Sequence, residues 1–299
     1  MLIRAATRGS ALARWQAEHV AQLLTAVDPE VRVEFVIVET TADRRLDIPI
    51  PEMGGKGVFV KEVQAAVLDG RADIAVHSAK DLPSVTHPDL ELAAIPERGD
   101  PRDALVGATL DKLRSGSRVA TGSIRRRAQL ANLRSGLEFF NLRGNIATRL
   151  EKAAEFDAII VAVAALERLG LADRISEILE PDVMLPQVGQ GALAVECAGD
   201  AYEVLDLLHR IDHAPTRRVV EAERAFLAEL GGDCNLPAGA HAVLTGGDVV
   251  RVDALVASVD GFPILRERVE ARDGVSAART AARRLLDERG GAELLAIDS

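Results

Sequence analysis

The feature that most constrains the fold is a regular alternation of short apolar runs and longer amphipathic stretches over the first two-thirds of the chain. Helical periodicity covers about 10–27 and 57–70, where Gly70 ends the second stretch. The strand-like runs lie at 2–7, 31–38 and 72–78, and in a second series at 103–108, 117–123, 137–142 and 157–163. Strands that alternate with helices in this way predict α/β architecture.

The last third of the chain has a different pattern. Its predicted elements are a helix at about 214–230, a hairpin at 241–258, a strand at 263–271 and a helix at 276–289. The hairpin is centred on Gly246 and Gly247, which suit the tight turn between two strands. We therefore predict a small C-terminal α+β domain that begins near residue 214.

Two segments of the α/β region resemble each other. "RAATRGSALARWQ" and "RVATGSIRRRAQL" both run from a strand through a short turn to a helix, with Ser10 and Ser123 at the helix start. A serine and free backbone N–H groups at a helix N-terminus suit anions. The repetition predicts two similar α/β domains that face one cleft.

Positive charge is concentrated in one part of an acidic chain. The net charge is -10, which argues against a general nucleic-acid or membrane-surface binder. Yet residues 118–149 contain seven arginines and one acid, Glu138. Arginine side chains bind carboxylates in a bidentate manner. Proteins that bind single-stranded nucleic acid stack bases on aromatic side chains, and aromatic residues make up only 3% of this chain. Small ligands with several carboxylates therefore fit this region better than nucleic acid. Some of these arginines could simply lie at the surface, above all Arg118, Arg127 and Arg134.

Asp81 is the acidic candidate for chemistry. It follows a predicted strand in "ADIAVHSAKDLP", and ligands of open α/β sheets bind just beyond the carboxyl ends of strands. A carboxylate there can accept N–H bonds or stabilise a developing cation. The alternative is an aspartate that forms a turn before proline. His77, on the strand, is more typical of a structural residue.

The two cysteines lie in different settings. Cys197 ends the apolar run "ALAVEC" and is expected to be a buried, inert strand residue, whereas Cys234 lies in the glycine-rich loop "LGGDCNLPAGAH". The N-terminus lacks the apolar stretch of a signal peptide, and no apolar run has the length of a membrane span. We expect a cytoplasmic protein without a disulfide. The scattered His and Cys predict no metal site.

Eight motifs occur in one order along the chain and together closely resemble the porphobilinogen deaminase family, also called hydroxymethylbilane synthases. They are "TRGSALARWQ", "GGKGVFVKE", "ADIAVHSAKDLP", "GSIRRRAQL", "LRGNIATRL", "AIIVAVAALERLGL", "LPQVGQGALAVEC" and "GGDCNLPAG". The resemblance runs from residue 3 to about 240. Each motif alone is weak, but eight in sequence are specific.

The resemblance implies an α/β fold with two periplasmic-binding-protein-like domains and a small C-terminal α+β domain. The implied boundaries are 1–98 with 192–211, 99–191, and 214–299. It also implies a transferase that condenses four porphobilinogen units head to tail, loses one ammonia each time and releases hydroxymethylbilane by hydrolysis. The implied cofactor is a dipyrromethane primer, bound through a thioether to Cys234. The expected protein is a monomer that binds neither nucleic acid nor membrane.

The resemblance also implies roles for individual residues, with Asp81 stabilising the cation left by ammonia loss. The implied catalytic residues are Asp81, Arg8 and Lys80. The implied cofactor-binding residues are Cys234, Lys80, Asp81, Ser123, Arg125, Arg126, Arg143 and Gly144. The implied substrate-binding residues are Arg8, Ser10, Arg149, Arg168 and Gln190. The polar segment 41–57 resembles a mobile lid, with Asp43, Gly54, Gly55, Lys56 and Gly57 as its residues.

Three features depart from the family pattern: Asp233 beside the cysteine, Gly122 in the arginine turn, and the Arg44–Arg45 pair in the lid. Asp233 adds a negative charge beside the thiol, which disfavours the thiolate. Two other interpretations stay open from sequence. The chain could be a non-enzymatic solute-binding module, or a family member that does not assemble its cofactor.

Overall fold

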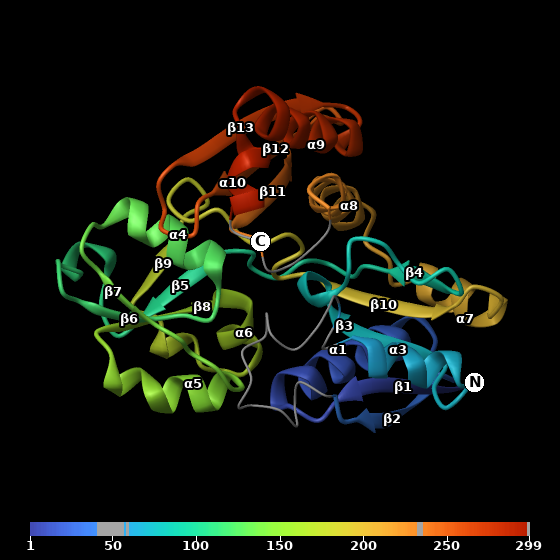
Figure 1. Cartoon of the computed structure of the whole chain (residues 1–299). Helices are drawn as coiled ribbons and strands as arrows, with labels where there is room; N and C mark the ends of the chain where they lie inside the picture. Colours follow the sequence, from blue (N-terminus) through green and yellow to red (C-terminus); the bar gives the residue numbers. More distant parts are fainter. Residues whose placement is uncertain (41–56, 58–59, 232–235, 298–299) are drawn as a thin grey trace. The chain divides into compact units, whose positions relative to one another are not determined.

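The computed structural model describes residues 1–40, 57, 60–231 and 236–297. The chain divides into two compact units, which we describe one at a time. Unit 1 contains Met1–Gly99 and Ala192–Arg217, and unit 2 contains Asp100–Gly191 and Arg218–Ser299. Figure 1 shows the elements of both units with their labels.

Unit 1 is built on a five-stranded mixed sheet with the strand order β2-β1-β3-β10-β4. Its strands are β1 (Leu2–Arg8), β2 (Arg32–Val38), β3 (Ile74–Ser78), β4 (Leu90–Ala94) and β10 (Leu193–Ala198). Strand β1 pairs in parallel with β2 and β3, and β10 is antiparallel to both β3 and β4. The returning strand β10 therefore places residues from beyond position 190 between β3 and the edge strand β4 (Figure 1).

The helices of unit 1 are α1 (Ala11–Val27), α3 (Lys61–Leu68) and α7 (Tyr202–His209). Ser10 caps α1, because its side chain accepts a hydrogen bond from the Ala13 N–H. Strand β3 is buried from Ile74 to His77, as expected of a central strand covered on both faces. The core of this unit combines side chains of β1, β3, β10, α1 and α7.

Unit 2 contains two sheets. The first has the order β7-β6-β8-β5-β9, and the second is the antiparallel set β11-β12-β13. The first sheet comprises β5 (Asp103–Val106), β6 (Arg118–Ala120), β7 (Glu138–Phe140), β8 (Ala158–Ala162) and β9 (Glu177–Leu179). The second comprises β11 (Ala238–Leu244), β12 (Val250–Ala257) and β13 (Ile264–Ala271). Strands β6, β7 and β8 are parallel, whereas β5 is antiparallel to β8 and β9.

The helices around the first sheet are α4 (Ile124–Leu133), α5 (Ile146–Lys152) and α6 (Val163–Arg168). Those near the second are α8 (Ala214–Glu229), α9 (Gly274–Arg283) and α10 (Gly291–Ile297). Gly246 and Gly247 both have positive φ, as the predicted turn between β11 and β12 requires.

The predicted fold class is confirmed: the structure contains two α/β sheets and a small C-terminal three-stranded sheet with helices. Sequence reasoning did not find the short strands β4 and β9. The expected helix at 276–289 also differs, because α9 ends at Arg283 and a π-helical turn follows over Arg284–Glu288. Cys197 is a buried strand residue as expected, and burial raises its pKa to about 12.

Candidate functional site

One cavity of unit 1 brings together three residues predicted from sequence. Arg8 is the last residue of β1, Ser10 caps α1, and Asp81 ends the short 3-10 turn Ala79–Asp81 that follows β3. All three line a cavity of about 70 Å³. Because β1 and β3 are parallel neighbours, their carboxyl ends meet at one edge of the sheet, where α/β sheets bind ligands.

The cavity offers groups of both charges to a ligand. Arg8 supplies a guanidinium and Asp81 a carboxylate, and Lys80 precedes Asp81 in the same turn. The Ser10 oxygen accepts from the Ala13 N–H at 3.3 Å, which leaves the hydroxyl hydrogen able to donate to a ligand. Such a set can bind a molecule that carries both a carboxylate and N–H groups.

The cavity wall continues into a buried polar cluster that sequence reasoning missed. His77 of β3 lines the cavity, and its Nε2 lies 3.1 Å from Oε2 of Glu196 on β10. Glu196 is fully buried, and the Gln64 amide donates to its two oxygens at 3.1 and 2.8 Å. The buried Nε2 has no hydrogen-bond partner among the described residues, so its contact with Glu196 is electrostatic.

In unit 2 the arginine turn forms a buried ionic cluster. Ser123 caps α4 by accepting from the Arg126 N–H, and the side chains of Arg125 and Arg126 are almost fully buried. Both contact Asp103, the first residue of β5: Arg125 Nη2 lies 2.7 Å from Oδ2, and Arg126 Nη2 lies 2.7 Å from Oδ1. Gln190 donates to Oδ1 at 2.8 Å and to the Pro101 carbonyl at 2.7 Å.

The cluster strongly stabilises the ionised form of Asp103. Burial by itself raises the pKa of this carboxyl. The charges of Arg125 and Arg126, with hydrogen bonds from Arg126 and Gln190, outweigh that effect and lower the pKa to about 2. Sequence reasoning missed Asp103, because a lone acid at the start of "DALV" carries no signal that two arginines more than twenty positions later will pair with it.

The cluster still has unused hydrogen-bonding capacity. Two guanidinium charges contact the single carboxylate of Asp103, which leaves this group of three with a net charge of +1. Arg125 Nε is buried and has no hydrogen-bond acceptor among the described residues. Gly239 of β11 packs against the Arg125 side chain, since a Cβ at this glycine would lie 3.1 Å from Arg125 Cδ. The Arg125 side chain is therefore closely confined.

The other predicted anion-binding residues lie around α5 and α6. The Arg149 Nε donates to the Gly144 carbonyl at 2.8 Å, and Arg143 precedes that glycine in the same loop. Gly144 has a φ of 110°, and a Cβ there would lie 2.9 Å from the Thr148 side chain, so the position requires glycine. Arg168, at the end of α6, donates to the Gly191 carbonyl at 2.6 Å, and burial lowers its pKa to about 10.

The arginines expected at the surface do have local structural contacts. Arg118 donates to the Glu155 carbonyl, and its guanidinium lies over the Phe140 ring at 4.7 Å. Arg127 lies over the ring of Phe139 at 5.6 Å, and Arg134 donates to the Leu110 carbonyl.

Part of the predicted site lies outside the described residues. These positions are Cys234 with Asp233, and Asp43, Arg44, Arg45, Gly54, Gly55 and Lys56 of the expected lid. Gly57, the last lid residue, is described and has a φ of 78°. The lid and the cysteine loop stay predictions.

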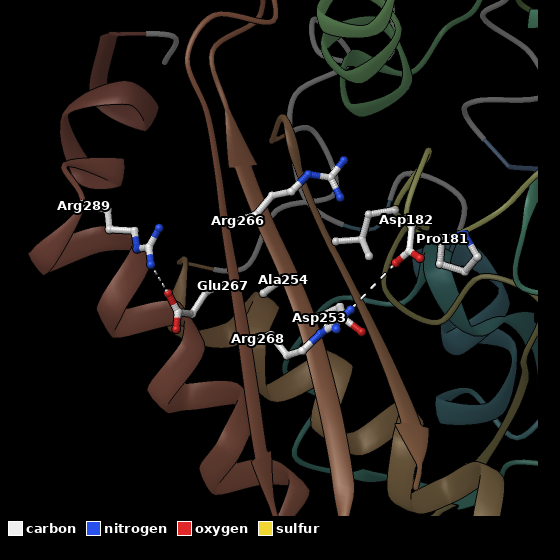
Figure 2. A pocket seen from close by; sticks show the side chains of 9 residues that line it. Pro181, Asp182, Asp253, Ala254, Arg266, Glu267, Arg268 and Arg289 are labelled. Carbon is white, nitrogen blue, oxygen red and sulfur yellow. Dashed lines mark hydrogen bonds and ion pairs between the residues drawn. The ribbon is translucent and has the colours of Figure 1, made fainter.

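A larger cavity of about 380 Å³ lies in unit 2, between the 181–185 turn and strands β12 and β13 (Figure 2). Three arginines and three acids line it. They include the pairs Arg289–Glu267 at 2.9 Å and Arg268–Asp182 at 3.8 Å. Its charges balance, and none of the predicted site residues that the structure describes lines it, so we do not assign the site here.

The described part of the chain contains no group of three or more His, Cys, Asp or Glu side chains arranged to bind a metal ion. None of its helices combines the length and the apolar character that crossing a membrane demands.

Family comparisons cover most of the chain. The family model described as "Porphobilinogen deaminase, dipyromethane cofactor binding domain" matches residues 3–206, and "Porphobilinogen deaminase, C-terminal domain" matches 218–288. A porphobilinogen deaminase from Nitratidesulfovibrio vulgaris is 49% identical over 271 residues, covering 89% of this chain and 86% of that protein. One from Roseiflexus sp. is 47% identical and covers 97% of each chain.

Solved structures that match part of the chain are more distant in sequence. A TRAP periplasmic solute binding protein from Desulfovibrio salexigens is 13% identical, with a TM-score of 0.43 over 71% of this chain and 72% of that one. The methionine binding protein MetQ is 12% identical, with a TM-score of 0.43 over 72% of this chain and 92% of that one.

Proposed function

This chain belongs to the porphobilinogen deaminase family, and we propose that Asp81 is its central catalytic residue. The family reaction joins four porphobilinogen units head to tail with loss of one ammonia each, and hydrolysis then releases hydroxymethylbilane. The chain is thus a transferase of tetrapyrrole and haem biosynthesis. The observation that carries the residue assignment is the common cavity of Arg8, Ser10 and Asp81 at the carboxyl ends of β1 and β3.

The family cofactor is a dipyrromethane, and the residues of unit 2 fit such a group. It carries several carboxylates, and the Asp103 cluster has a net charge of +1 and a buried Arg125 Nε without an acceptor among the described residues. When bound, this group supplies the free pyrrole carbon to which the first substrate unit is joined. The residues of unit 2 that would bind it are Ser123, Arg125, Arg126, Arg143 and Gly144. The family resemblance adds Lys80 and Asp81, with Cys234 as the covalent anchor.

Asp81 and Arg8 have complementary tasks in this proposal. The Asp81 carboxylate accepts hydrogen bonds from pyrrole N–H groups and stabilises the cation that remains when ammonia leaves. Arg8 and the Ser10 hydroxyl, which line the same cavity, bind substrate carboxylates. Arg149, Arg168 and Gln190 complete the set of substrate-binding residues that we propose.

The remaining proposals concern the whole chain. We propose three domains at 1–98 with 192–211, 99–191 and 214–299, supported by one separate sheet in each. Porphobilinogen is the small-molecule substrate, and we propose that the chain binds neither nucleic acid nor membrane. A cytoplasmic location is supported by the need for a reduced thiol at Cys234. A monomer is supported by the origin of all proposed site residues in one chain.

The intact mass of the purified protein tests the covalent part of the proposal. We expect an excess over 31.9 kDa equal to two deaminated porphobilinogen units, located on Cys234 by peptide mapping. Cys234→Ala should abolish that excess, and the matched variant Cys197→Ala should retain it. A Cys234 that stays unmodified after incubation with porphobilinogen would contradict the anchor and favour a family member without its cofactor.

Asp81→Asn tests the catalytic assignment. The variant keeps the shape of the side chain and removes its charge, so we expect turnover to fall at least about 100-fold while the cofactor mass and the melting temperature are retained. Near-normal turnover of this variant would refute the assignment.

A further inference from the structure

Every coupling step of this reaction releases a proton. When a new C–C bond forms at the free α-carbon of the terminal pyrrole, that carbon carries both its hydrogen and the new substituent. The ring becomes aromatic again only when the C–H bond breaks, so the cavity needs a group that accepts this proton. Arg8 carries a guanidinium that has no acceptor site, and Asp81 is already bonded to pyrrole N–H groups in the proposed mechanism.

His77 lies in the same cavity as Asp81 and is in contact with a buried carboxylate. It is on β3, four positions before Asp81, and both side chains line the 70 Å³ cavity. The imidazole Nε2 lies 3.1 Å from Glu196 Oε2, and the Glu196 side chain is fully buried. In register, His77 pairs with Ala194 of β10, so Glu196 lies two residues further along on the same face of the sheet.

Glu196 is itself firmly positioned. The Gln64 amide contacts both of its oxygens, and α3, β3 and β10 all contribute to the cluster. A buried carboxylate beside an imidazole stabilises the imidazolium that forms when the ring accepts a proton, as in the histidine–aspartate pair of serine proteases. Here the contact is electrostatic rather than a straight hydrogen bond, and stabilisation of a charged ring needs only the short distance.

We propose that His77 is a further catalytic residue, the base that takes the α-proton in each coupling step, and that Glu196 and Gln64 are its positioning residues. This inference rests on the proposed function of the Asp81 cavity. The C–H bond breaks, its electron pair returns to the pyrrole ring, and the proton moves to Nδ1 of the imidazole, because Nε2 is the nitrogen that faces Glu196. The ammonia lost from the incoming unit can then accept that proton as ammonium, which resets His77 for the next unit.

The test uses porphobilinogen with deuterium at its free α-carbon and compares its rate with that of the unlabelled compound. If His77 is the base, His77→Gln makes proton removal the slow step. We expect kcat to fall by about 10²–10⁴ with KM little changed, and a deuterium isotope effect on kcat larger than that of the unaltered protein. Glu196→Gln should show the same enlarged isotope effect with a smaller fall in kcat.

Asp73→Asn is the matched control. Asp73 lies just before β3 and pairs with Arg4 of β1 at 2.7 Å. Asp73→Asn therefore removes an ionic contact within the same sheet as Glu196→Gln does, but Asp73 does not line the cavity. It should leave kcat and the isotope effect unchanged. Melting temperature and intact mass, measured for every variant, separate misfolding and loss of the covalent primer from loss of catalysis. If His77→Gln does not fold, the isotope effect and kcat of Glu196→Gln decide the test.

Two results would overturn the inference. The first is a His77→Gln variant whose kcat and isotope effect equal those of the unaltered protein. If His77→Gln does not fold, the same result in Glu196→Gln would overturn the inference. The other is an enlarged isotope effect in Asp81→Asn alone, which would make Asp81 the base. Failure of the proposed function is distinguishable, because the unaltered protein would then neither carry the two pyrrole units nor consume porphobilinogen.

Discussion

Replacing Asp103 with asparagine removes the carboxylate that both buried arginines of the α4 turn contact. The change preserves the shape of the side chain, so its effect is mainly electrostatic. Arg125 and Arg126 would stay almost fully buried with an amide in place of their counter-ion. Removing one partner of a buried ion pair costs about 3–5 kcal/mol, because the remaining charge is left uncompensated.

That free energy predicts a large change in thermal stability. At about 2–4 °C per kcal/mol for a unit of 150–250 residues, the melting temperature of unit 2 should fall by roughly 6–20 °C. Glu180→Gln is a suitable control, because Glu180 pairs with Arg102 at 2.5 Å but its side chain is 62% exposed. An exposed pair contributes at most about 1 kcal/mol, so this control should melt within a few degrees of the unaltered protein.

The pH dependence gives an independent check on the cause. The pKa of Asp103 is lowered from 3.8 to about 2 in the folded protein, which corresponds to stability on the order of 2 kcal/mol. Because the folded-state pKa is the lower one, this contribution is present above the unfolded value of 3.8. It is lost as the pH falls through about 2. The asparagine variant lacks this titration.

Urea unfolding of both proteins at about pH 6 and about pH 2.5 measures the difference directly. The gap in unfolding free energy between the unaltered protein and Asp103→Asn should be largest at the higher pH and shrink toward the lower one. A gap that does not change with pH would refute the electrostatic explanation. So would a melting temperature equal to that of the Glu180→Gln control.

Three further changes have expected outcomes. Arg168→Gln should raise KM by about 10–100-fold, because a charge-assisted hydrogen bond to a substrate carboxylate contributes about 1.5–3 kcal/mol; steady-state kinetics measure this. It should also lower the melting temperature, because the hydrogen bond to the Gly191 carbonyl is lost. Gly144→Ala should destabilise the loop before α5 by about 1–3 kcal/mol in urea unfolding, since φ is 110° and the new Cβ would meet Thr148. Ser123→Ala should cost about 1 kcal/mol through loss of the α4 cap, and a cost near zero would mean that its hydroxyl does not stabilise the helix.

Local patterns allowed much of the fold to be predicted. Apolar alternation identified the central strands, and Ser10 and Ser123 both cap helices as expected. The glycine pair at 246–247 marked the hairpin correctly. Strands β4 and β9 were missed because short segments of three to five residues are defined by their partners in the sheet rather than by their own composition.

The candidate site residues that lie in family motifs could be named from the sequence. Resemblance to the family identified Arg8, Ser10 and Asp81, and the structure brings all three to one cavity. It also singled out Arg125 and Arg126, but it contained nothing about Asp103, their ionic partner. A family motif identifies candidate site residues, whereas the counter-ions of those residues come from the strand that packs beside them after folding.

The sequence by itself determined most of the elements, their order and the concentration of arginines between residues 118 and 149, because these depend on periodicity, capping and local charge. Only the tertiary structure decided which distant side chains became partners. Strand β10 inserts between β3 and β4 and thereby brings Glu196 to His77 and Gln64, with 132 positions separating Gln64 from Glu196. A buried carboxylate is stable only where hydrogen bonds and charges surround it, and that environment is created by the packing of the sheet.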